Sequence, residues 1–126
     1  MHRLLLLTAL LLLLPGGCGG DDDDQRRTVT AKPGATLAVA ADEYSFDPER
    51  VVLTGAGELT VELENVGVLA HNLKVFDGGD EIGGTPTFTG GKTRSGTVTV
   101  APGEYELVCT VGDHAELGMT GKLSVR

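Results

Sequence analysis

The sequence predicts an all-β sandwich of about seven or eight short strands. Apolar and polar residues alternate along residues 58–64 and again along residues 97–100, and a period of two is typical of half-buried strands. The 19 glycines and the many β-branched residues lower the helix propensity of the chain. No segment carries a sustained apolar period of 3.6 between helix start and stop signals. Strands are therefore expected to build the core.

The other expected strands are short apolar runs bounded by Gly, Pro, Asn or Asp. They cover residues 36–41, 50–54, 71–76, 104–109 and 122–126. Tyr44, Phe46 and Phe76 are interpreted as core aromatic residues without a binding role. Residues 77–91 contain three Gly-Gly pairs, and the sequence predicts no path for this segment.

Residues 1–17 have the features of a secretory signal, with a basic start followed by a run of leucines over residues 4–14. The run is shorter than the roughly 20 apolar residues that a membrane-spanning helix needs. Cys18 follows Pro15-Gly16-Gly17, a context that resembles the lipobox of bacterial lipoproteins. Lipidation of Cys18 is the hypothesis; in the alternative, cleavage occurs nearby and Cys18 is a spacer thiol.

Residues 18–35 are expected to be a flexible acidic tether, because they have no apolar period and include a run of four aspartates. Residues 36–126 then form one domain. An exported chain tethered through lipid would lie at the outer face of the bacterial cytoplasmic membrane or in the periplasm.

The charge of the chain argues against nucleic acid as a partner. Lys and Arg number 10 against 18 Asp and Glu, giving a net charge of −8, whereas phosphate binding needs clustered basic residues. The chain has 2 cysteines, too few for a disulfide framework. The cysteine remaining after Cys18 is thus a free thiol or a metal ligand.

A metal-binding pattern stands near the C-terminus. Cys109, His114 and Met119 form the spacing C-x4-H-x4-M, and His71 opens an expected strand elsewhere in the chain. A thiolate, two imidazoles and a weak axial thioether form the donor set of blue-copper sites. Zinc is the competing metal, but structural zinc sites use four strong Cys or His ligands. Copper therefore fits the pattern better.

The order of these motifs resembles the cupredoxins, the small blue-copper family that includes plastocyanin and azurin. The matching blocks are Tyr44-Ser45-Phe46-Asp47-Pro48, Asn65-Val66-Gly67, His71-Asn72-Leu73, Pro102-Gly103-Glu104-Tyr105 and the segment from Cys109 to Leu123. The resemblance implies a Greek-key sandwich holding one mononuclear type 1 copper. It also implies His71, Cys109 and His114 as equatorial ligands, Met119 as the axial ligand, and Asn72 as a residue that ties the ligand loops together.

The expected function is single-electron transfer by Cu(II)/Cu(I) cycling in a monomer that is not an enzyme. Copper oxidases and nitrite reductases need additional histidines, whereas the 3 histidines here are His2 in the signal, His71 and His114. The partner would be a redox protein, such as a cytochrome or a membrane oxidase or reductase. The resemblance implies that it meets an exposed edge of His114.

Surface residues supply two further expectations about the partner. An apolar patch is expected around His114, formed by Val68, Leu69, Ala115 and Leu117. Acidic residues are expected to steer a basic partner; they are Asp42, Glu43, Asp77, Asp80 and Glu81.

Two alternatives use the same domain differently. A copper carrier or storage module would use the same ligands but release its ion to an acceptor. A metal-free β-sandwich would serve in adhesion or another interaction. The rate of copper exchange distinguishes the copper carrier from an electron-transfer protein. Copper stoichiometry distinguishes the metal-free β-sandwich from both.

Overall fold

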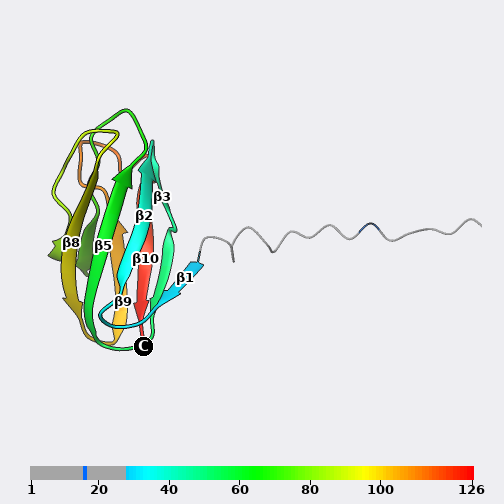
Figure 1. Cartoon of the computed structure of the whole chain (residues 1–126), viewed down its shortest axis with the longest axis vertical. Coiled ribbons are helices and arrows are strands. Elements are labelled where there is room, and N and C mark those ends of the chain that lie inside the picture. Colours follow the sequence, from blue (N-terminus) through cyan, green and yellow to red (C-terminus); the bar gives the residue numbers. More distant parts are fainter. Residues whose placement is uncertain (1–15, 17–27) are drawn as a thin grey trace, which may run out of the picture.

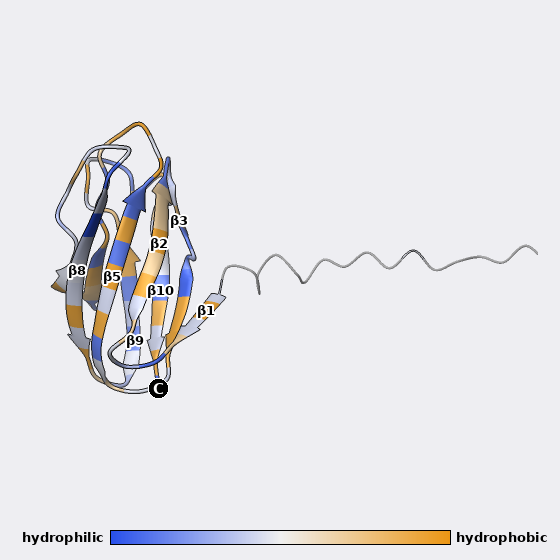
Figure 2. Cartoon of the chain, in the orientation of Figure 1, coloured by the Kyte–Doolittle hydropathy of each residue, from blue (hydrophilic) through white to orange (hydrophobic). Residues whose placement is uncertain are grey.

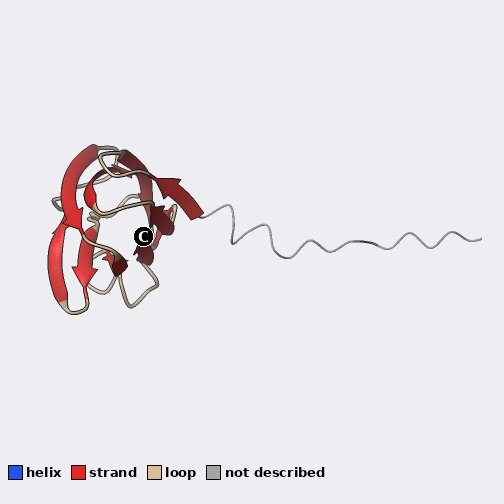
Figure 3. Cartoon of the chain, turned by 90° about the horizontal axis from the view of Figure 1, so that it is seen from below, coloured by secondary structure: helices blue, strands red, loops and turns tan. Residues whose placement is uncertain are grey.

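The computed structural model describes residue 16 and residues 28–126, and shows two β-sheets packed face to face (Figure 1). These residues form ten strands and no helix, which confirms the all-β sandwich (Figure 3). No helix long and apolar enough to cross a membrane occurs in this part of the chain. The leucine run and Cys18 lie outside the described residues.

One sheet has six strands and the order β1-β4-β10-β9-β6-β7. Their bounds are β1 Thr28–Ala31, β4 Arg50–Leu53, β6 Lys74–Asp77, β7 Asp80–Gly84, β9 Gly103–Val108 and β10 Thr120–Val125. Strand β4 pairs in parallel with both β1 and β10, whereas the remaining pairs are antiparallel.

The second sheet has four strands and the order β3-β2-β5-β8. Their bounds are β2 Thr36–Asp42, β3 Ser45–Asp47, β5 Gly57–Asn65 and β8 Thr93–Val100. Strands β2 and β5 are parallel, and β3 and β8 pair antiparallel with them.

The core lies between the sheets and follows the predicted alternation. On β5, Leu59, Val61 and Leu63 are at most 1% exposed while Glu58, Glu62 and Glu64 face solvent, an alternation that Figure 2 shows along the strand. Leu53 and Leu123 are fully buried on the facing sheet. Each such leucine contributes about 1.5–3 kcal/mol by leaving water.

The N-terminal boundary of the domain was predicted too late in the chain. Residues 28–31 form strand β1 on the outer edge of β4, so the flexible tether does not extend to residue 35 as expected. Three of the four residues of β1 are exposed. The sequence Thr28-Val29-Thr30-Ala31 does alternate polar and apolar residues, but over only four positions, the shortest length at which alternation indicates a strand.

Residues 77–91, which had no predicted path, include β7 and then run beside the segment that begins at His71. The backbones of Thr85 and Leu73 bond at 2.9 Å, and His71 and Phe88 exchange two backbone bonds of 3.1 Å. His71 therefore forms an isolated bridge, and the expected strand 71–76 begins only at Lys74. Phe46 is buried in the core as predicted, whereas Phe76 is half-buried.

The two sheets meet closely where β7 passes β8, and glycines permit this approach. A Cβ atom at Gly96 would overlap the backbone carbonyl of Gly84. A backbone atom cannot move aside as the end of a flexible side chain can, so a larger residue must push the strands apart.

Replacing Gly96 with alanine is expected to lower the free energy of unfolding of the copper-free protein by about 1–3 kcal/mol, because overpacking strains both strands. Urea denaturation measures the loss. The control is Gly79→Ala in the turn between β6 and β7, where a Cβ meets no atom within 4 Å. Equal stabilities of the two variants would contradict the prediction.

Candidate metal centre

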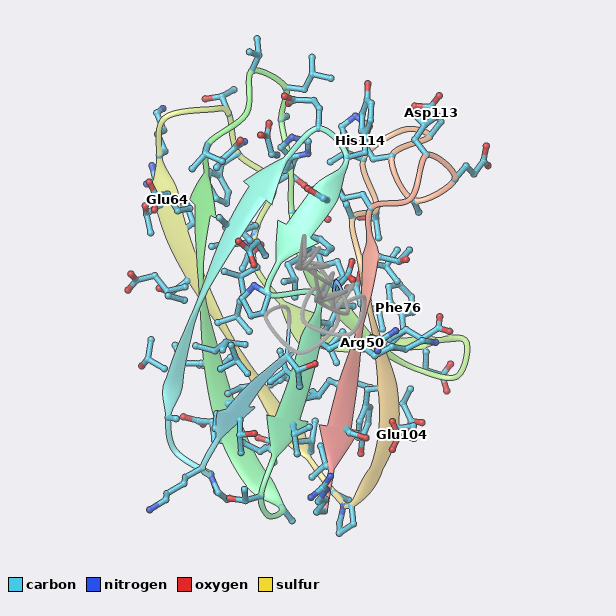
Figure 4. The ribbon with its side chains drawn as sticks, turned by 90° about the vertical axis from the view of Figure 1, so that its right-hand side faces the viewer. Arg50, Glu64, Phe76, Glu104, Asp113 and His114 are labelled. Atoms are coloured by element: carbon cyan, nitrogen blue, oxygen red, sulfur yellow. The ribbon has the colours of Figure 1, made fainter. Side chains whose placement is uncertain are left out.

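Two of the predicted ligands adjoin the ends of neighbouring strands. Cys109 directly follows β9 and Met119 directly precedes β10, and the amide of Cys109 donates to the carbonyl of Met119 at 3.1 Å. Because β9 and β10 are antiparallel neighbours, both ends of the intervening loop meet at one point. His114 lies in this loop, at one end of the sandwich, while Glu104 lies toward the other end (Figure 4).

Backbone hydrogen bonds inside the loop fix the position of His114. Its amide donates to the carbonyl of Val111 at 3.0 Å, and its own carbonyl accepts the amide of Met119 at 3.0 Å. Gly118 has a φ of +105°, in the region that favours glycine. His114 therefore lies between two hydrogen-bonded turns, one that begins at Val111 and one that ends at Met119, where the chain enters β10.

Three side chains converge on one point. The Sγ atom of Cys109 lies 3.5 Å from Nδ1 of His114 and 4.0 Å from Nδ1 of His71. Among the described residues these three form one group whose ligand atoms all lie within 4.8 Å of one another. Cys109 and His71 are fully buried, and His114 is 6% exposed. Met119 is also fully buried.

The separations fit a shared metal ion. An ion about 2.3 Å from sulfur and about 2.0 Å from nitrogen, with bond angles of about 110–120°, holds the two donor atoms roughly 3.5–3.7 Å apart. The observed distances of 3.5 and 4.0 Å lie close to this range. A soft thiolate with two imidazoles is a donor set that copper accepts in both oxidation states.

Asn72 joins the loop that follows His71 to the loop that follows Cys109. Its side-chain amide donates to the hydroxyl oxygens of Thr87 at 2.8 Å and Thr110 at 2.9 Å. Its Oδ1 accepts the backbone N–H of Thr110 at 2.9 Å. The residues after both ligands are thereby held in a fixed relation.

Glu43, one of the acidic residues expected to steer a partner, forms hydrogen bonds within the centre. Its carboxylate lies 2.8 Å from Nε2 of His71 and accepts the amides of Leu69 at 2.8 Å and Val68 at 3.0 Å. The N–H of Leu69 is the main reason that the pKa of Glu43 falls to about 2; burial opposes the shift, and His71, Val68 and Asp42 add to it. Glu43 is therefore part of the hydrogen-bonded surroundings of His71, and its role in steering a basic partner stays a prediction.

Tyr44 also has a position that the sequence did not predict. Its ring centre lies 5.0 Å from that of His114, with the planes inclined by 60°. The residue is half-buried and packs against the core, as predicted, but its ring also covers one side of the imidazole. Its place in the turn between β2 and β3 brings it there, and no periodicity marks such a turn.

An apolar surface surrounds the centre. Val68 is 88% exposed, Leu117 51% and Leu69 42%. Leu117 belongs to the His114 loop, and the other two belong to the loop before His71, whose tip is coloured hydrophobic in Figure 2. Because His114 is only 6% exposed, little of the imidazole edge reaches this surface.

Three solved structures illustrate how widely this fold is shared. Auracyanin B has a TM-score of 0.68 at 22% identity, covering 78% of this chain and 93% of that one. Auracyanin A, a "blue" copper protein from Chloroflexus aurantiacus, has a TM-score of 0.65 at 23% identity, with coverages of 76% and 100%. Rusticyanin from Thiobacillus ferrooxidans has a TM-score of 0.62 at 21% identity, covering 83% of this chain and 90% of that one.

A comparison with curated protein sequences found no match. Residues 33–126 match the family model described as copper binding proteins, plastocyanin/azurin family. This match contains all four predicted ligands and both loops that carry them. The chain therefore belongs to the plastocyanin/azurin family of copper-binding proteins, the cupredoxins.

Proposed function

We propose that this chain is a type 1 copper protein that transfers single electrons between redox partners. In this proposal His71, Cys109 and His114 would hold the copper as the strong ligands, and Met119 would supply a weaker fourth one. The observation that carries it is the convergence of the Cys109 sulfur and two imidazole Nδ1 atoms in a buried position.

The protein contributes a pre-arranged set of donors. Copper, when bound, supplies the Cu(II)/Cu(I) couple. The loop that holds His114 is closed by its own backbone bonds, and Asn72 ties it to the His71 side. Ligands held in this way move little when the charge of the site changes, and a small rearrangement favours fast electron transfer.

Burial of the ligands favours electron transfer over copper delivery. Cys109, His71 and Met119 are fully buried, so an acceptor protein would have to open the loop to reach the ion. A non-enzymatic role is consistent with the histidine content, because the proposed site uses both histidines outside the signal segment.

The docking surface in this proposal is the apolar end of the sandwich. A redox protein, such as a cytochrome or a membrane oxidase or reductase, would cover Val68 and Leu117 and exchange electrons through His114. Steering would come from the acidic residues, of which Glu43 contacts His71. Asp42 lies beside the centre, whereas the others belong to the β6–β7 hairpin on the flank, near Phe76 in Figure 4; these are Asp77, Asp80 and Glu81.

The proposed location is the outer face of the bacterial cytoplasmic membrane or the periplasm. The signal-like residues 1–17 and the lipobox-like context of Cys18 support it. We propose that the protein acts as a monomer held by lipid at Cys18.

Loading the protein with copper and oxidising it is expected to give an intense visible absorption band from the bond between the Cys109 thiolate and copper. The band should bleach on reduction and return on reoxidation. Cys109→Ser should abolish it, because a hydroxyl cannot replace the thiolate as a soft ligand. A Cys109→Ser protein that keeps the band would refute the ligand assignment, and a wild-type protein that binds copper without colour would refute the type 1 site.

Copper exchange tests electron transfer against delivery. The loaded protein is expected to keep its ion through repeated redox cycles in the presence of a copper chelator, since the ligands are buried. Rapid and complete loss of copper to the chelator, measured by metal analysis after gel filtration, would favour the carrier alternative.

The rate of electron transfer to a basic cytochrome is expected to fall as the ionic strength rises, because salt screens the attraction between opposite charges. Stopped-flow measurement of the bimolecular rate constant tests this expectation. Asp42→Asn is expected to weaken the salt dependence more than Asp80→Asn, which changes the distant hairpin. A rate that is independent of salt would remove the steering proposal.

A further inference from the structure

The carboxylate of Glu43 contacts the nitrogen of His71 that faces away from the thiol. Glu43 lies in the turn between β2 and β3, 28 residues before the histidine. Its Oε1 is 2.8 Å from Nε2 of His71, while Nδ1 of the same ring lies 4.0 Å from the sulfur of Cys109. The imidazole therefore stands between an anionic group and the proposed copper position.

The chemistry of this contact sets the tautomer of His71. An ionised carboxylate can only accept hydrogen bonds, so Nε2 must carry the hydrogen that it donates. Nδ1 is then left with a free lone pair directed to the side of the ring on which Cys109 lies. A hydrogen bond of this kind also makes the imidazole a stronger ligand.

The surrounding backbone holds the carboxylate in place. The amides of Val68 and Leu69 both donate to it, and such donors favour the ionised form that a glutamate already has at neutral pH. Gly67 allows the loop to close over it, since a Cβ atom there would overlap the carboxylate oxygens. The turn between β2 and β3 and the segment 67–71 thus meet at one side chain.

We propose that Glu43 is a positioning residue for the copper ligand His71, and that its negative charge lowers the reduction potential of the site. This inference rests on the proposed function. In the one-electron reduction of Cu(II) to Cu(I) by a redox partner, the site loses one positive charge. A nearby anion stabilises the more positive state and so disfavours the reduction.

The two effects predict measurable shifts. Loss of an outer partner of a metal-bound histidine typically costs about 10–100-fold in metal affinity. If Glu43→Gln weakens Cu(II) binding about tenfold more than Cu(I) binding, the reduction potential rises by about 59 mV for a one-electron couple. Cyclic voltammetry of the copper-loaded full chain measures this shift.

Two further variants distinguish the loss of the Glu43 charge from a change in side-chain packing and from the loss of an exposed charge elsewhere. Glu43→Asp keeps the charge and is expected to give a potential nearer to that of wild type than Glu43→Gln does. Asp113→Asn removes a charge from an exposed residue beside the other histidine ligand (Figure 4). It is expected to raise the potential less than Glu43→Gln, because its exposed charge is screened by solvent.

Nitrogen-15 NMR of the copper-free wild-type protein at neutral pH supplies a readout that needs no variant and no metal. His71 is expected to be the Nε2–H tautomer; an Nδ1–H tautomer would overturn the proposal. Equal potentials for wild type and Glu43→Gln, or a Glu43→Gln shift no larger than that of Asp113→Asn, would also overturn it. Failure of the proposed function itself would appear differently, as a wild-type protein without the blue band.

Discussion

The antiparallel pairing of β9 and β10 is the constraint on which the centre depends. It brings the end of one strand and the start of the next together, so that Cys109 and Met119 become neighbours although a whole loop separates them. The loop between them can then be short and closed by its own hydrogen bonds. The backbone pairing of β9 with β10, and not the loop between them, determines where the Cys109 thiol lies.

Beyond the ends of the strands, hydrogen bonds from side chains hold the loops in place, as the backbone hydrogen bonds do within the sheets. Asn72 bonds across from the His71 segment to the residue after Cys109. Glu43 gathers the loop before His71 in a similar way, using an anionic acceptor where Asn72 uses an amide. Tyr44, the next residue, packs on His114. The turn between β2 and β3 therefore supports both histidines from one side.

The sequence was sufficient to predict the fold class, the main core strands and the three side chains that the structure brings together, His71, Cys109 and His114. Period-two alternation is strong wherever a strand is buried on one face, as in β5. Strands β1, β3 and β7 were missed because they are short and mostly polar or exposed. The roles of Glu43 and Tyr44 were missed for a different reason: both depend on contacts between residues far apart in the chain. A glutamate in a turn has the same sequence pattern whether it faces water or a histidine.

The close approach of Gly84 and Gly96 couples the packing at the edge of the sandwich to the affinity for a metal ion, because both affect the stability of the folded chain. The ligand atoms of His71 and Cys109 meet only in the folded chain, so an ion that binds all of them binds the native state in preference to the unfolded one. By mass action such an ion raises the apparent stability in proportion to the logarithm of its concentration. The same linkage runs in reverse: a crowded residue where β7 passes β8 would increase the unfolded fraction and thereby weaken the apparent affinity for copper, without touching a ligand.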